Sequence, residues 1–84
     1  ILARNYRCGM GEVDLVALDG AYVVFGEVKA RHAADPAAPF AALGRRQQQR
    51  IVRAAQHYLA RHRLLDRDVR FDVVGVRLGG GAPQ

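Results

Sequence analysis

Hydrophobic and polar positions divide the chain into four extended segments and one helix. Residues 1 to about 7 alternate loosely, residues 13–18 and 21–29 are rich in β-branched and apolar residues, and residues 69–78 alternate with several valines. From about Gly44 to His62, apolar residues recur at spacings of three and four, as in an amphipathic helix. The expected order is strand, hairpin, helix, strand. Since the last strand follows a helical crossover, it can lie parallel to a neighbour, and we predict an α/β fold with a mixed sheet.

The length supports one small domain. A chain of 84 residues buries only somewhat over half of the surface that its unfolded form exposes. We place the domain at residues 1–78 and expect the glycine-rich residues 79–84 to be a flexible tail. Residues 30–43 contain Pro36 and Pro39 and form a long connection of the kind that often carries function. Because the chain begins at Ile1 without an initiator methionine, we expect that an upstream segment has been removed or was not included.

The turn of the hairpin determines which side chains share a face. Asp19-Gly20 tolerates the positive φ angles of a tight type I′ turn, and we predict it as the two central residues. The resulting cross-strand pairs are Leu18 with Ala21, Val16 with Val23, Asp14 with Phe25 and Glu12 with Glu27. Alternation then places one set on one face: Glu12, Asp14, Val16, Leu18, Val23, Phe25, Glu27 and Lys29. The other face carries Val13, Leu15, Ala17, Tyr22, Val24 and Val28, so we expect both faces of the sheet to be covered.

The ionisable residues of the first face stand out in the composition. Lys29 is the only lysine beside twelve arginines, and Glu12 and Glu27 are the only glutamates. Carboxylates that face each other repel, and partial burial adds a desolvation cost that a divalent cation would relieve. Mg²⁺ or Mn²⁺ suits such a site, because Mg²⁺ needs only one or two protein carboxylates together with water and substrate phosphate.

We therefore predict a metal site with a catalytic lysine beside it. Asp14 and Glu27 are the expected ligands, and the backbone carbonyl of Val28 and the carboxylate of Glu12 are additional ones. Lys29 is expected to position or help deprotonate the attacking water and to stabilise phosphate charge. The alternative is that these residues are solvent-facing salt-bridge partners near strand ends.

The net charge of +5 and the pI near 10.4 favour a polyanionic partner, because arginines gain from releasing counterions condensed on phosphates. We expect nucleic acid, with DNA favoured over RNA, and an anionic membrane surface ranks second. The arginines assigned to nucleic-acid binding are Arg7, Arg31, Arg45, Arg46 and Arg50, although a basic helix is commonly just a solvated face.

Membrane and disulfide classes are disfavoured. No run is long and apolar enough to span a bilayer and no charged leader with a cleavage site is visible, so we expect no membrane partner and a cytoplasmic location. Cys8 is the only cysteine, which excludes an intrachain disulfide and a cysteine-based zinc site. The three histidines are dispersed and lack metal-ligand spacing.

Four segments together resemble the bacterial YraN family: Gly11 to Ala17, Val24 to Arg31, the helix from Arg45 to Leu59, and Arg70 to Val74. That family resembles the PD-(D/E)XK nuclease superfamily, which has a restriction-endonuclease-like fold, and is similar to archaeal Holliday junction resolvases. The resemblance implies magnesium-dependent phosphodiester hydrolysis. Asp14 matches the first acidic residue of the superfamily signature, Glu27 the second and Lys29 the lysine that ends it.

The resemblance also implies a role for Gln48, which matches a helix glutamine and shares a stripe with Ile51, Val52 and Ala55 that can face the sheet. An ordinary surface glutamine is the alternative. The family usually begins with a helix that carries a glutamate, and that helix is absent from these residues.

The function predicted from these observations is a nucleic-acid-binding, Mg²⁺-dependent endonuclease that acts on branched or duplex nucleic acid. One alternative is a non-catalytic nucleic-acid-binding module that retains the nuclease architecture. Another is a protein-interaction or assembly module, including a homodimer.

Overall fold

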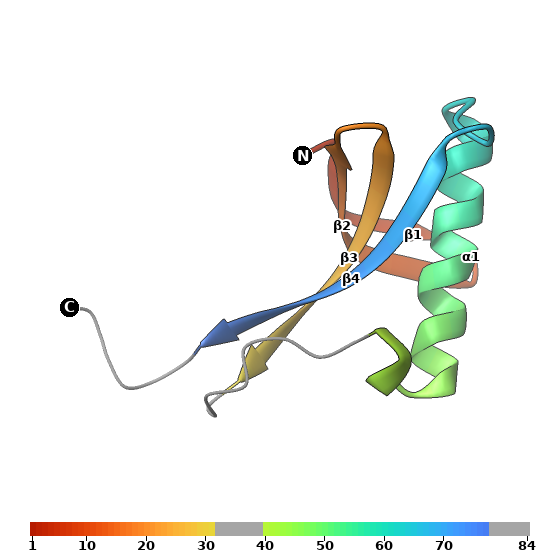
Figure 1. Cartoon of the computed structure of the whole chain (residues 1–84). Helices are drawn as coiled ribbons and strands as arrows, with labels where there is room; N and C mark the ends of the chain where they lie inside the picture. The colour runs from red at the N-terminus through yellow and green to blue at the C-terminus, as the bar shows by residue number, and fades with distance from the viewer. Residues whose placement is uncertain (32–39, 78–84) are drawn as a thin grey trace.

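The computed structural model describes residues 1–31 and 40–77, which form a four-stranded mixed sheet with one long helix on one face (Figure 1). The elements are β1 (Ala3–Cys8), β2 (Gly11–Asp19), β3 (Tyr22–Arg31), the short 3-10 helix η1 (Phe40–Ala42), α1 (Arg45–Arg61) and β4 (Asp68–Arg77). The sheet order is β1-β2-β3-β4. β2 pairs antiparallel with β1 and β3, and β3 pairs parallel with β4. The predicted element order and the parallel last strand are confirmed.

Two predicted segments fall wholly or partly outside the described residues. The tail at residues 79–84 lies outside them, as do residues 32–39 of the long connection. At the end of that connection, η1 precedes α1, and the amide of Leu43 donates to the carbonyl of Phe40 at 3.0 Å.

The core lies between α1 and the strands beneath it. The buried positions of the helix are Ile51, Ala54, Ala55, Tyr58 and Leu59, and they pack on Val13, Val16, Val23 and Phe25. Fully burying one such side chain contributes about 1.5–3 kcal/mol, so the apolar stripe is what holds α1 on the sheet. The helix ends at His62, where the amide of Leu64 donates to the carbonyl of Leu59 at 2.8 Å across the left-handed residue Arg63.

Gly11 is the point where the helix backbone approaches the sheet most closely among the glycines described. A Cβ atom at this position would lie 2.6 Å from both the amide nitrogen of Ala54 and the carbonyl oxygen of Arg50. Only glycine leaves room for this contact. It fixes the first half of α1, and the polar side chains that it carries, against the start of β2.

The hairpin register differs from the prediction by two residues. The turn residues are Gly20 and Ala21, and the pairs are Asp19 with Tyr22, Leu18 with Val23, Ala17 with Val24, Val16 with Phe25 and Leu15 with Gly26. Gly20 has φ +60°, and a type II′ turn needs a positive φ only at this first central position, whereas a turn over Asp19-Gly20 would force Asp19 into the left-handed region as well. Since the shift is two residues, side chains keep their predicted faces near the turn.

The alternation along β2 breaks further from the turn. Val13 and Val16 are both fully buried in the same core, so the prediction that Val13 lies on the opposite face is wrong. Asn5 on β1 and Asp14 on β2 lie opposite each other in the register but are not a paired position. Asn5 has a left-handed backbone conformation with φ 51°. Asparagine tolerates this conformation better than most residues. The ribbon therefore changes face at the position of Asp14.

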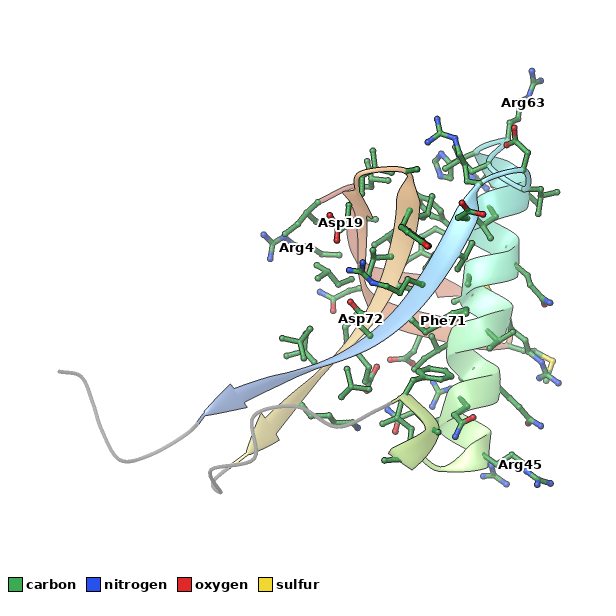
Figure 2. The ribbon with its side chains drawn as sticks, viewed as in Figure 1. Arg4, Asp19, Arg45, Arg63, Phe71 and Asp72 are labelled. Atoms are coloured by element: carbon green, nitrogen blue, oxygen red, sulfur yellow. The ribbon has the colours of Figure 1, made fainter. Side chains whose placement is uncertain are left out.

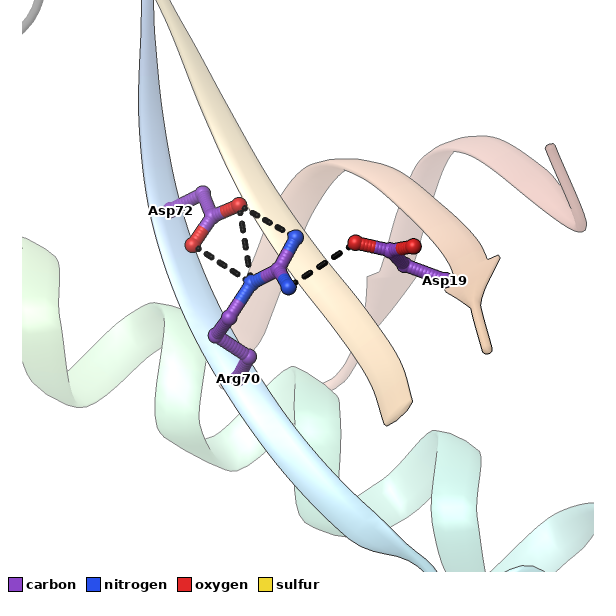
Figure 3. Close-up of polar contacts among 3 residues, drawn as sticks. All are labelled: Asp19, Arg70 and Asp72. Atoms are coloured by element: carbon purple, nitrogen blue, oxygen red, sulfur yellow. Dashed lines mark hydrogen bonds and ion pairs between the residues drawn. The ribbon is translucent and has the colours of Figure 1, made fainter. Parts of the chain in front are cut away.

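The prediction that both faces of the sheet are covered is wrong for residues 1–31 and 40–77, because one long helix covers one face (Figure 1). On the opposite side Tyr22, Val28 and Val74 are each more than 40 % exposed. The guanidinium of Arg70 lies there between Asp19 and Asp72, with ion pairs of 2.9 and 3.1 Å (Figure 3). Figure 2 shows Asp19 and Asp72 on the side of the sheet away from α1. We name this surface the open face.

Among the residues that the structure describes, no helix has both the length and the apolar run needed to cross a bilayer.

Candidate active site

Glu27 is the buried charged residue of the described chain, with 8 % of its surface exposed. It lies on β3, on the face that α1 covers. The ammonium of Lys29 lies 3.3 Å from its Oε2 atom, and the side-chain amide of Gln47 donates a hydrogen bond to the same oxygen. One oxygen of this carboxylate is therefore held in place by two side chains.

Asp14 is held beside Glu27 by the backbone of β3. The amide of Val28 donates to its Oδ2 atom at 2.9 Å. The last backbone pair between β2 and β3 is Leu15 with Gly26, so the amide of Val28 lies beyond it. The Asp14 carboxylate accepts the hydrogen bond that a backbone carbonyl of β2 would otherwise accept. The amide and carbonyl of one strand residue point to the same edge, so the Val28 carbonyl also points toward β2.

The two carboxylates influence each other directly. Burial is the largest cause that raises the pKa of Glu27 above its ordinary value, and the negative charge of Asp14 is the second. The hydrogen bond and charge of Lys29 lower this pKa, and a hydrogen bond with Asp14 raises it further. The net shift is upward. Without a cation, ionisation of Glu27 therefore costs folding free energy.

Glu27→Gln is expected to stabilise the metal-free protein at neutral pH. Because the folded pKa of Glu27 is raised, its contribution to stability falls as the pH rises from the unfolded value near 4.5 to the folded value, and stays low above it. The advantage of the variant should therefore be larger at pH 7 and should shrink as the pH falls toward 4.5. Urea unfolding in EDTA across this pH range measures it.

Glu12→Gln is the matched control for that experiment, because it removes a carboxylate from a solvent-exposed pair worth at most about 1 kcal/mol. It should not stabilise the protein. A Glu27→Gln variant that is less stable than the parent chain at pH 7 would show that the Lys29 contact outweighs burial and the charge of Asp14.

Glu12 lies near the pair but has a different partner. Its carboxylate forms an ion pair with the guanidinium of Arg50. It also lines a small cavity of about 40 Å³ together with Glu27, Gln47, Arg50 and Ile51. This volume holds roughly three water-sized molecules. In the described ranges, no group of three or more histidine, cysteine, aspartate or glutamate side chains is arranged to hold a metal ion.

The structure brings Gln47, rather than Gln48, to the carboxylates. The side chain of Gln48 donates to the carbonyls of Ala41 and Leu43 at 3.3 and 2.7 Å, at the turn before α1. The predicted stripe through Gln48 counted Val52 as buried. The deeper residue is Ala54, which is fully buried, and Gln47 precedes Ile51 by one helical turn. In the sequence, the small residue Ala54 was the feature that could have indicated which side of α1 faces the sheet.

The predicted nucleic-acid-binding arginines separate into two groups. Arg7, Arg46 and Arg50 line one cavity of about 500 Å³, and Arg53, which the sequence reading did not assign to nucleic acid, lines it too. Arg45 lies in the first turn of α1 (Figure 2) and lines a different hollow, together with Gln48, Gln49 and Val52. The side chain of Arg31 lies outside the part that the structure describes.

The sequence matches one family of known proteins over most of its length. The model of the uncharacterised protein family UPF0102 matches residues 1–76. The chain belongs to the UPF0102 family. A UPF0102 protein of Geobacter metallireducens is 44 % identical over 84 residues, which are 100 % of this chain and 69 % of that protein. A UPF0102 protein of Methylococcus capsulatus is 42 % identical over 84 residues, which cover 100 % of this chain and 68 % of the relative.

Proposed function

We propose that this UPF0102 chain carries a metal-dependent phosphodiester hydrolase site that acts on branched or duplex nucleic acid, DNA in preference to RNA. The observation that carries the proposal is the buried carboxylate of Glu27 beside Asp14, with a pKa raised by burial and by that neighbour. Groups with such perturbed pKa values are concentrated at functional sites. A divalent cation removes the repulsion between the two carboxylates and turns an unfavourable pair into a ligand set.

The donor chemistry fits Mg²⁺ or Mn²⁺. The protein holds one oxygen of each carboxylate, that of Asp14 through the amide of Val28 and that of Glu27 through Lys29 and Gln47. Such outer contacts orient metal ligands. With the Val28 carbonyl, Asp14 and Glu27 supply the two carboxylates that are typical for Mg²⁺, and Glu12 is left to its pair with Arg50.

The ion, when bound by these groups, supplies Lewis-acid polarisation of the phosphate and acidifies the attacking water. The other tasks belong to the chain. The ammonium of Lys29, with 35 % of its side chain exposed, reaches both Glu27 and the solvent side, where it stabilises the negative charge that develops on the phosphate. Gln47 keeps the Glu27 carboxylate in one orientation, so it is a positioning residue.

The sequence resemblance supports the same chemistry. Asp14 and the run Glu27-Val28-Lys29 match the PD-(D/E)XK signature, and the contacts of Lys29 with Glu27 and of Asp14 with the Val28 amide support this match. We propose a restriction-endonuclease-like arrangement on this basis, with likeness to Holliday junction resolvases as its most specific form. The net charge of +5 favours a polyanionic substrate.

Incubation of the intact protein with branched, duplex and single-stranded DNA, and with RNA, in Mg²⁺ or Mn²⁺ tests the proposal. Cleavage of branched or duplex DNA that EDTA abolishes is the expected result. Cleavage that persists unchanged in Lys29→Ala would reveal a contaminant or another site. No cleavage, together with binding that is independent of metal, would favour a nucleic-acid-binding module without turnover.

Assembly is a second candidate function, and the open face favours it. Tyr22, Val28 and Val74 present apolar surface there around the Arg70 ion pairs. Surfaces of this kind mark protein contacts when they are contiguous. Light scattering at physiological salt tests for a homodimer, and a monomer at every concentration would remove this candidate.

A further inference from the structure

One cavity of the described residues is rich in arginine and lies next to the carboxylate pair. It has a volume of about 500 Å³, and we name it the arginine pocket after Arg7, Arg46, Arg50 and Arg53, which line it. Ligand pockets commonly have volumes of about 300–1,000 Å³. Its opposite wall is the turn between β1 and β2 at Gly9 and Met10.

Helical spacing and the contact at Gly11 create the pocket. Arg46, Arg50 and Arg53 are separated by four and three residues, so they lie on one side of α1. Arg7 comes from β1, where it pairs with Glu12 on β2. The helix backbone rests on Gly11, which lines the same cavity as these arginines.

The lining is strongly basic. Its four arginines less one glutamate, Glu12, leave three positive charges. Glu12 forms an ion pair with Arg50, and Arg53 has a contact of 4.0 Å with the sulfur of Met10. Like charges four residues apart on a helix are destabilising by roughly 0.2–0.5 kcal/mol per pair, so the spacing of Arg46 and Arg50 adds no stability to the helix by itself. Guanidinium groups bind phosphate through paired hydrogen bonds, which makes phosphate the matching ligand.

The arginine pocket also touches the candidate active site. Glu12 and Arg50 line both this pocket and the small cavity beside Glu27. We propose that the arginine pocket is a phosphate subsite that anchors a nucleic-acid strand next to the Asp14 and Glu27 carboxylates. The inference rests on the proposed function for the identity of the strand, whereas binding of phosphate in this pocket requires no metal.

Fluorescence anisotropy tests the subsite in EDTA, with intact protein that carries Asp14→Asn to prevent cleavage. The probes are short oligodeoxynucleotides with a 5′-phosphate, a 3′-phosphate or neither. Arg46→Gln and Arg53→Gln should each weaken binding about tenfold, the loss expected for a hydrogen bond to a charged group, and should each reduce the salt slope by about one. Arg67→Gln removes the same charge from an exposed position in the turn after α1 and should change affinity less than about twofold.

The three probes distinguish two sources of the phosphate. Tighter binding of one phosphorylated end supports a subsite for a terminal phosphate, and equal binding of all three supports a phosphate within the strand. An equal loss in Arg67→Gln and in the pocket variants would overturn the subsite, because it would show that general charge accounts for the affinity.

Cys8 gives an independent readout, since it lines the arginine pocket and is the only cysteine in the chain. Bound oligonucleotide should slow its alkylation by iodoacetamide several-fold. Alkylation at an unchanged rate under saturating oligonucleotide would place the ligand elsewhere. Pocket binding and Cys8 protection in a protein that neither binds Mn²⁺ nor cleaves would uphold the subsite and reject the hydrolase, so the two proposals fail separately.

Discussion

Asp14→Asn is expected to lower metal-dependent cleavage by about 100-fold or more. Loss of a group that only orients a metal ligand costs up to about 100-fold, and Asp14 is proposed as a ligand itself. The asparagine keeps an oxygen that accepts the hydrogen bond from the Val28 amide, so the connection between β2 and β3 remains. It removes the negative charge that Mg²⁺ requires and one of the causes that raise the pKa of Glu27. Initial cleavage rates with saturating Mg²⁺ or Mn²⁺ measure the loss.

Asp72→Asn is the matched control for this substitution. Asp72 lies on the open face, where it pairs with Arg70 on the side of the sheet away from α1 (Figure 3). The same chemical change there should leave the cleavage rate within about twofold, since an exposed ion pair contributes at most about 1 kcal/mol. If Asp14→Asn cleaves as fast as the parent chain, the carboxylate has no part in the reaction.

Gly11→Ala is expected to cost about 3 kcal/mol or more, at the upper end of the range for overpacking, because the new methyl group meets helix backbone rather than a movable side chain. The distances of 2.6 Å to the Ala54 nitrogen and the Arg50 oxygen force α1 away from β2. A domain of this length has a total stability of only about 4–12 kcal/mol. Urea unfolding should therefore show a much lower midpoint, and nucleic-acid binding through the arginine pocket should weaken as the helix moves.

Gly9→Ala provides the comparison, since a Cβ atom at Gly9 has no neighbour within 4 Å. Its stability should stay within about 0.5 kcal/mol of the parent chain, as is usual for exposed positions. Equal stability of Gly11→Ala and the parent chain would mean that α1 does not rest on β2 at this glycine.

Local patterns predicted the elements well because each has a strong physical signature. Valine-rich alternation identifies β3 and β4, and the apolar stripe from Ile51 to Leu59 identifies α1. The hairpin register was wrong by two residues because Asp19-Gly20 and Gly20-Ala21 are both acceptable turns and the choice depends on which φ angles the chain adopts. The error was harmless to the site, since an even shift keeps side chains on their faces.

The details of the site depend on features that periodicity does not encode. The break in alternation at Asp14 follows from a left-handed Asn5 on the neighbouring strand. Gln47, rather than the predicted Gln48, contacts Glu27, because α1 turns its small residue Ala54 toward Gly11 on the sheet. The arginine pocket forms where α1 rests on Gly11, and this contact between a helix and a strand cannot be predicted from the pattern of either segment.

The account depends most on whether Asp14 and Glu27 bind one divalent ion together, and calorimetric titration of Mn²⁺ into the intact protein measures this directly. We expect one Mn²⁺ per chain, binding that is lost in both Asp14→Asn and Glu27→Gln, and binding that is retained in Glu12→Gln, since Glu12 is paired with Arg50. Undiminished Mn²⁺ binding in Asp14→Asn and Glu27→Gln, or no binding by the parent chain, would contradict the account.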